Sequence, residues 1–128
     1  MFRFLKRRRA IRSFVYKLPL DLRQRFGEKN FYSIDELDKI FSRLQYNEAF
    51  KAYAYALLCS RSTFDDYFNQ LHVNCTYDGL RQSVAKKYFR GITDFDALSL
   101  IRFAKGVGNG SYRENFFGTS QGNDTAQI

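Results

Sequence analysis

The sequence predicts an all-α protein, and three observations favour this fold class. Apolar residues recur at the spacing of amphipathic helices, and N-capping residues precede these segments. Runs of alternating Val, Ile and Thr, which would indicate strands, are missing from the sequence. A chain of 128 residues has the length of one domain. We therefore expect a compact single-domain bundle of five to seven short helices around a buried central helix at residues 47–59.

The first predicted helix is basic and amphipathic and covers residues 1–18. On a helical wheel its apolar side chains fall within one stripe roughly 100° wide, and they are Phe4, Ile11, Phe14, Val15 and Leu18. Arg7 falls inside the same stripe, so we expect the first two turns to overhang the core and packing to begin near Ile11. Pro19 then ends this helix and opens a short second one, which stops at Gly27.

The two middle helices have the clearest local signals. The segment SIDELDKIFSRL predicts a helix at 33–44, because Ser33 and Glu36 have the spacing of a capping box. Asn47 is the predicted N-cap of the next segment, EAFKAYAYALLC, in which alanines alternate with larger apolar residues and few positions are charged. A helix that is apolar on most sides belongs in the interior. We therefore place helix 47–59 at the centre of the bundle.

Three further helix starts follow the central helix. Ser62, with an acidic residue three positions later, predicts the cap of TFDDYFNQL. Thr76 predicts the cap of YDGLRQSVAKKYFR, and Gly91 lies just past its end. Thr93, again with an acidic residue three positions later, predicts the cap of DFDALSLIRFAK, which Gly106 closes. These elements complete a helical domain at residues 1–105.

The composition changes after residue 105. Residues 106–128 are rich in Gly, Asn and Ser, which predicts a C-terminal tail. The string GVGNGSY within it has the glycines of a phosphate-binding loop. Such a loop also needs a preceding strand, a following helix and a nearby Lys or acidic partner, which this segment lacks. A helix stop followed by a tail is the simpler interpretation.

The net charge of +8 is concentrated at the start of the chain. Residues 1–18 carry seven basic residues and no acidic one, whereas residues 19–128 carry fourteen Lys and Arg against thirteen Asp and Glu. The body is therefore nearly neutral, and the basic character is a local property of the first helix. The candidate residues for contact with a polyanion are Arg3, Lys6, Arg7, Arg8, Arg9 and Arg12.

The basic helix leaves several interpretations open. It docks on an acidic surface of a partner protein or of a second copy of the chain, or it is a solvated face without a dedicated partner. Alternatively, it binds the phosphate backbone of nucleic acid without sequence specificity, with Lys86, Lys87 and Arg90 as further contacts. A third alternative is peripheral association with an anionic membrane, with the apolar residues near the start inserted at the interface. We expect a non-enzymatic interaction protein, with protein docking ahead of the other contacts.

Catalytic and metal-binding patterns are sparse in this sequence. His72 is the only histidine, so a Cys–His pair would have to join it to Cys59 or Cys75. The simpler interpretation places both thiols in the core. Three Cys and His residues are too few for a structural zinc site, and the acidic pairs Asp65–Asp66 and Asp94/Asp96 are explained as residues of first helical turns. We therefore expect no enzymatic activity, cofactor or small-molecule substrate.

The sequence also favours a cytoplasmic location. No apolar run follows the basic start at the length that a secretory signal needs, and no stretch approaches eighteen apolar residues. Two cysteines without CxxC spacing fit a reducing compartment.

Two segments, FYSIDELDKIF and AYALLCS, together with the length and the basic start, resemble a small bacterial family of uncharacterised proteins. The resemblance covers residues 1 to about 105. It implies an all-helical cytoplasmic protein of unknown function, and it supplies no activity, ligand or catalytic residue.

Overall fold

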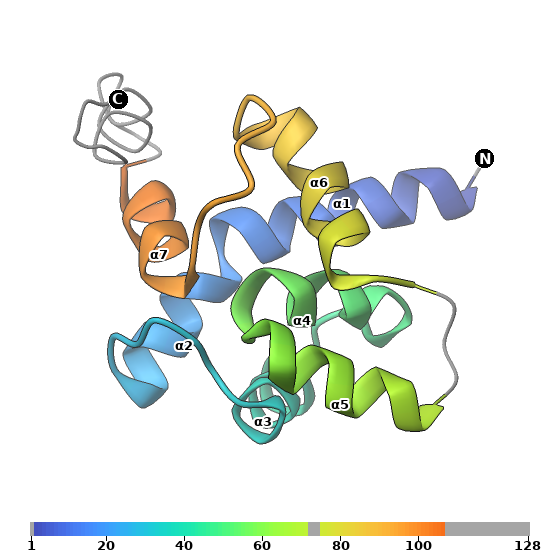
Figure 1. The fold of residues 1–128 in the computed structure, drawn as a ribbon. Coiled ribbons are helices and arrows are strands. Elements are labelled where there is room, and N and C mark those ends of the chain that lie inside the picture. The colour runs from blue at the N-terminus through green and yellow to red at the C-terminus, as the bar shows by residue number, and fades with distance from the viewer. Residues whose placement is uncertain (1, 72–74, 107–128) are drawn as a thin grey trace.

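The computed structural model describes residues 2–71 and 75–106, and every regular element in these two ranges is helical (Figure 1). The elements are α1 (Phe2–Tyr16), α2 (Leu18–Phe26), α3 (Ile34–Leu44), the 3-10 helix η1 (Glu48–Phe50), α4 (Lys51–Leu58), α5 (Arg61–Leu71), α6 (Tyr77–Tyr88) and α7 (Ala97–Lys105). The predicted all-α fold class is confirmed. Most of the predicted tail, from residue 107 onward, lies outside the described residues.

Helix α4 lies at the centre of the bundle, as predicted. Its residues from Ala54 onward are fully buried, and it packs against α1, α5 and α6 (Figure 1). The predicted single helix at 47–59 is wrong in its boundaries. Asn47 accepts a hydrogen bond from the amide of Ala49 at 2.9 Å, and its carbonyl accepts one from the amide of Phe50. This i to i+3 bond tightens the first turn into η1, and α4 begins only at Lys51.

Aromatic rings fill much of the core, which joins helices far apart in sequence. Phe14 of α1 lies 5.5 Å from Phe41 of α3 between ring centroids. Tyr16 of α1 stacks on Phe103 of α7 at 5.7 Å, and Phe103 meets Phe89, just past the end of α6, at 5.0 Å. Each of these pairs adds to the free energy gained from burying the rings. The second half of α1 therefore contacts both α3 and α7 through aromatic rings.

Several predicted helix ends are confirmed. Ser33 and Glu36 form both hydrogen bonds of the capping box at the start of α3. The Thr76 hydroxyl accepts a hydrogen bond from the amide of Gly79 at 3.0 Å and caps α6. Gly27 closes α2 with a φ of 83°, a conformation that glycine adopts without steric cost. Gly91, also at positive φ, follows the end of α6.

The predicted cap of the fifth helix is wrong by two residues. α5 begins at Arg61, and the Ser60 hydroxyl accepts a hydrogen bond from the amide of Thr63 at 3.3 Å. Ser62 therefore lies inside the first turn instead of capping it. Both serines precede an apolar-periodic segment, so the local pattern suits either start. The earlier start extends the helix by two residues and includes the backbone hydrogen bond from the amide of Phe64 to the carbonyl of Ser60.

The predicted start of the last helix at Thr93 is also wrong. Asp96 is the N-cap of α7, and its carboxylate accepts a hydrogen bond from the amide of Ser99 at 2.9 Å. The preceding loop is held by neighbours instead, because the carbonyls of Thr93 and Phe95 both accept hydrogen bonds from Arg81. In a helix that began at Thr93, the same carbonyls would accept hydrogen bonds from backbone amides of that helix.

Candidate functional site

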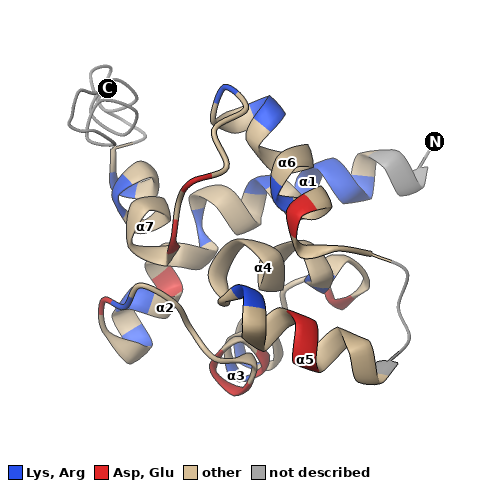
Figure 2. Cartoon of the chain, in the orientation of Figure 1, with Lys and Arg blue, Asp and Glu red and all other residues tan. Residues whose placement is uncertain are grey.

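The basic half of α1 comprises residues 3–12 of this helix. Its described part, from Leu5 onward, leads away from the packed part of the helix (Figure 2). Lys6, Arg7, Arg8, Arg9 and Arg12 are exposed, and from Leu5 onward the first buried residue of the helix is Ala10. For residues 5–9 the structure agrees with the predicted overhang, and Arg7 is exposed although it falls within the apolar stripe. The side chain of Arg3, the sixth predicted contact residue, lies outside the described residues.

One groove, here called the α1–α3 groove, runs between α1 and the turn that follows α3. It encloses about 430 Å³, and its cationic side chains are Lys6, Arg9 and Lys17. Leu44 and Tyr46 contribute its apolar surface. The ammonium group of Lys17 lies 5.4 Å from the centre of the Tyr46 ring, a favourable cation–π distance. The Tyr46 hydroxyl donates a hydrogen bond to the carboxylate of Asp21, so one acidic group lies behind this groove.

A second groove, here called the α1–α6 groove, lies on the other side of the same helix. It encloses about 350 Å³, and its cationic side chains are Arg7 and Arg8 from α1 and Lys87 from α6. Its apolar surface comes from Ile11, Val84 and Tyr88, of which the last two are buried. The fold therefore brings Lys87 to the predicted basic helix. Lys86 and Arg90 are exposed but do not line this groove.

The two grooves share one electrostatic character. Six cationic side chains line them, and none of the described lining residues is acidic. Charges of one sign around a concave surface raise the local potential, and they attract anionic groups within about one Debye length, 8–10 Å at physiological salt. Both grooves therefore present a local positive potential next to apolar side chains.

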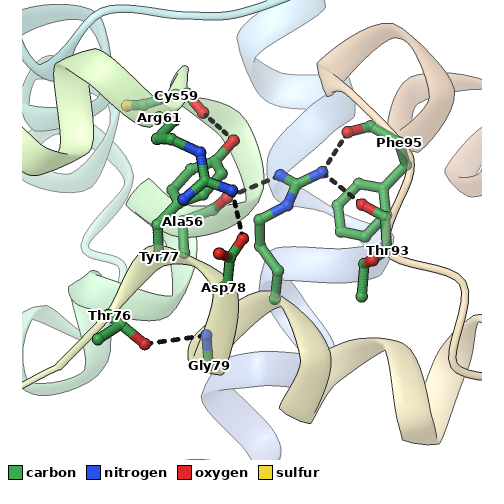
Figure 3. A network of polar contacts seen from close by, with 10 residues as sticks. Ala56, Cys59, Arg61, Thr76, Tyr77, Asp78, Gly79, Thr93 and Phe95 are labelled. Carbon is green, nitrogen blue, oxygen red and sulfur yellow. Dashed lines mark hydrogen bonds and ion pairs between the residues drawn. The ribbon is translucent and has the colours of Figure 1, made fainter.

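A different cation, Arg81, is the most buried charged residue in the described ranges, and the sequence prediction missed it. Arg81 belongs to α6, and only 5% of the residue is exposed. Its hydrogen-bond acceptors belong to Ala56, Thr93 and Phe95, which are labelled in Figure 3. The guanidinium donates hydrogen bonds to the carbonyls of Ala56 at 2.9 Å and Thr93 at 3.0 Å, and also to that of Phe95. It also lies 3.8 Å from the centre of the Phe95 ring.

These contacts make Arg81 a structural residue rather than a binding residue. Burial lowers the pKa of its guanidinium, because the interior solvates a charge less well than water does. Three carbonyl acceptors compensate for the lost water, and they join α4, α6 and the loop before α7. The burial of Arg81 could have been predicted from its position in the sequence. Residues 77, 81, 84 and 88 share one face of the helix, and the other three are buried as well.

The described residues do not form the catalytic or metal sites considered from the sequence. Burial raises the pKa of the Cys59 thiol to about 12, which disfavours the reactive thiolate, and it raises that of Cys75 as well. His72 lies outside the described residues. No cluster of three or more His, Cys, Asp or Glu residues that could hold a metal ion occurs within the described ranges.

The acidic pairs need a correction to their structural explanation. Asp65 and Asp66 follow the first turn of α5, which contains no acidic residue, because the helix starts earlier than predicted. Asp94 lies in the loop before α7, and only Asp96 acts as a cap. The prediction that both members of each acidic pair lie in the first turn of a helix is therefore wrong.

In the described part of the chain, no helix combines the length and the apolar character needed to cross a membrane.

Comparisons with known proteins place the chain in a family. Neither the curated proteins nor the solved structures yielded a significant match to the chain. A family model described as a family of unknown function (DUF6559) matches residues 1–127, so it extends through most of the predicted tail as well. The chain therefore belongs to the DUF6559 family, whose function is unknown.

Proposed function

We propose that this is a non-enzymatic interaction protein that docks an acidic surface of a partner protein, or of a second copy of the chain, through the basic half of α1. The observation that carries the proposal is the pair of grooves flanking this helix, each with three cationic side chains beside apolar surface. Protein interfaces combine these two features, since apolar contacts supply affinity and charges supply specificity and association rate.

Nucleic acid fits this surface less well. Proteins that bind single strands stack bases on exposed aromatic rings, whereas the rings that line the two grooves, Tyr46 and Tyr88, are buried to more than nine-tenths. The ring of Tyr16, beside Arg12, is partly buried and already packs against Tyr88 and Phe103. A duplex would be held by the cations alone and would leave the apolar surfaces of both grooves unused. Binding to the phosphate backbone is therefore the alternative that the experiment below must separate.

An anionic membrane also fits less well. A helix that lies in the interface needs an exposed apolar face opposite its charges. In α1 the apolar stripe of Phe14 and Val15 is fully buried in the core. Leu5 is 46% exposed and is the one large exposed hydrophobic residue on the described part of this helix. A single leucine provides little of the apolar area that such binding requires.

The test compares three labelled probes with the full chain across a salt series. The probes are a fluorescein-labelled oligoglutamate peptide, a short DNA duplex and phosphatidylserine vesicles. We expect the peptide to bind, and replacement of Lys6, Arg7, Arg8 and Arg9 by Gln to weaken its binding at least about tenfold. A matched variant with Arg23, Arg25, Lys39 and Arg43 replaced by Gln loses the same charge from exposed positions elsewhere and should bind within about twofold of the native chain.

Each other outcome would overturn the proposal in a defined direction. Tight binding of the duplex, with a salt slope of about 0.9 per phosphate contact that falls in the α1 variant, would assign the surface to nucleic acid. Binding of the vesicles alone would assign it to membranes. If none of the probes binds at low salt, the basic half of α1 is a solvated face without a partner.

A further inference from the structure

We infer that the α1–α6 groove selects its partner, and that it takes an acidic peptide segment with one apolar anchor side chain, such as leucine or phenylalanine. This inference rests on the proposed docking function and names the chemistry of its ligand. The geometry that carries it is a floor of apolar side chains between cations contributed by two different helices.

The floor of the groove suits an apolar side chain. Val84 and Tyr88 line the groove and are buried to more than nine-tenths, and Ile11 of the opposite helix lines it and is half-buried. The enclosed volume of about 350 Å³ is at the lower end of the range for binding pockets and holds a few side chains. An anchor placed here would remove its own apolar surface and that of the floor from water.

The cations of the groove suit carboxylates on either side of the anchor. Arg7 and Arg8 lie on α1, and Lys87 lies on α6 with its ammonium group 5.8 Å from the centre of the Tyr88 ring. A peptide laid along the groove therefore meets positive charge from both walls. Surface ion pairs alone contribute about 0–1 kcal/mol each, whereas buried apolar area contributes about 25 cal/mol per Å². The anchor is consequently what separates a specific ligand from any acidic chain.

The α1–α3 groove is the weaker candidate for this ligand, although it also has three cations. The carboxylate of Asp21 accepts the hydrogen bond of the Tyr46 hydroxyl and lies directly behind the apolar surface. It repels an acidic ligand and partly offsets the charge of Lys17, whose ammonium group lies over the same ring. Burial raises the pKa of Tyr88, the corresponding tyrosine of the α1–α6 groove, and the positive charges of Arg12 and Arg8 act in the opposite direction.

The test measures binding of two labelled peptides to the full chain: plain oligoglutamate, and oligoglutamate with one central leucine. We expect the anchored peptide to bind at least about tenfold tighter. Lys87→Gln should weaken its binding about three- to tenfold, whereas Lys86→Gln should leave it within about twofold. These two lysines are adjacent, exposed and equally charged, but only Lys87 lines the groove.

Two further variants make the test independent of folding. Ile11→Ala should bring the affinity for the anchored peptide close to that for plain oligoglutamate, and binding of the plain peptide reports that the surface is intact. The double variant Arg7→Gln and Arg8→Gln should weaken binding of the anchored peptide more than Lys6→Gln and Arg9→Gln, although both remove two charges from the same helix.

Several results would overturn the inference while leaving the proposed function in place. Equal binding of the two peptides would show that the groove does not recognise an anchor. Equal losses for Lys86→Gln and Lys87→Gln would assign the binding to the general field of the surface. A larger loss for the Lys6 and Arg9 pair would move the ligand to the α1–α3 groove. If neither peptide binds, the inference and the proposed function both fail.

Discussion

Two cationic regions of this molecule are built in opposite ways. Arg81 is buried, and its guanidinium bonds to backbone carbonyls from α4 and from the loop before α7. The basic half of α1 is exposed, and among the described residues neither Lys6 nor Arg9 forms an ion pair. One region uses positive charge to join elements of the fold, and the other presents it to solvent.

The contrast shows how a cation's surroundings indicate its role. A charge moved from water into the interior is tolerated only when protein groups replace its hydration, so a buried cation is tied to the stability of the fold. An exposed cation keeps its water, and removing it changes the folded state little. Charge changes at Arg81 should therefore alter stability, and those in α1 should alter binding.

The largest expected effect is that of Arg81→Met. The substitution keeps an apolar stem but leaves the carbonyls of Ala56, Thr93 and Phe95 without their donor. We expect the free energy of unfolding to fall by about 3 kcal/mol or more, measured by urea denaturation. Arg61→Met is the matched control, because the two guanidiniums lie 4.9 and 5.0 Å from the centre of the same Tyr77 ring (Figure 3).

Arg61 differs from Arg81 in being exposed, and its ion-pair partner among the described residues is Asp78. Its replacement should leave the urea midpoint close to that of the native chain. Equal losses in the two variants would mean that stacking on Tyr77, rather than burial with carbonyl partners, is what makes Arg81 important.

The next effect concerns the loop that Arg81 holds. Asp96→Ala removes the cap of α7 and the acceptor of the Asn30 side-chain amide at 2.7 Å. We expect a loss of about 1–2 kcal/mol in the free energy of unfolding. Asp94→Ala, an exposed acidic residue two positions earlier, removes the same charge without a cap and should have a much smaller effect. Similar losses would show that charge near Arg81, rather than capping, matters there.

A pH-dependent effect also distinguishes the interior region. Burial raises the pKa of Tyr77 above its usual value near 10, although the charges of Arg81 and Arg61 act to lower it. The folded state holds the Tyr77 proton more tightly than the unfolded chain does, so the protonated hydroxyl stabilises the folded state. This stabilisation is complete below about pH 10 and is lost as the pH rises through the raised pKa.

Tyr77→Phe tests this prediction. The variant loses the hydrogen bond to the Cys59 carbonyl, so it should be about 1 kcal/mol less stable at neutral pH. Above pH 10 the difference between the native chain and the variant should shrink, as followed by urea denaturation at increasing pH. A difference that stays constant with pH would contradict the raised pKa.

The smallest effect on stability is expected in α1. Replacing Lys6 to Arg9 by Gln should change the free energy of unfolding by no more than about 0.5 kcal/mol, because these side chains are exposed and Gln is a comparable helix former. Urea denaturation at low and high salt measures the change. A loss comparable to that of Arg81→Met would show that the basic half of α1 is part of the fold and remove the contrast between the two regions.

Local sequence patterns were sufficient where the structure depends on neighbours in the chain. The capping box at Ser33, the cap at Thr76 and the stop at Gly27 were all predicted, because each involves atoms within about one helical turn. The overhang of α1 followed in the same way from the helical wheel. The candidate contact residues from Lys6 to Arg9 could be predicted because they are adjacent in sequence and equal in charge.

Local patterns failed where two starts were equally compatible with the residues. Ser60 and Ser62 are both capping residues near the start of α5, and Thr93 and Asp96 both precede α7. In the second case Arg81 decides the outcome, because it takes the carbonyls of Thr93 and Phe95 out of any helix. Arg81 itself comes from another element, and its role was invisible until α6 and this loop were placed side by side.

The sequence by itself determined the all-α class, most helix ends and the concentration of positive charge in α1, since each depends on the periodicity or composition of a single segment. The tertiary structure alone decided the interior role of Arg81, the joining of Lys87 to the basic helix and the two grooves beside it. Those features are relations between helices, and they arise only when the apolar faces pack and bring distant side chains together.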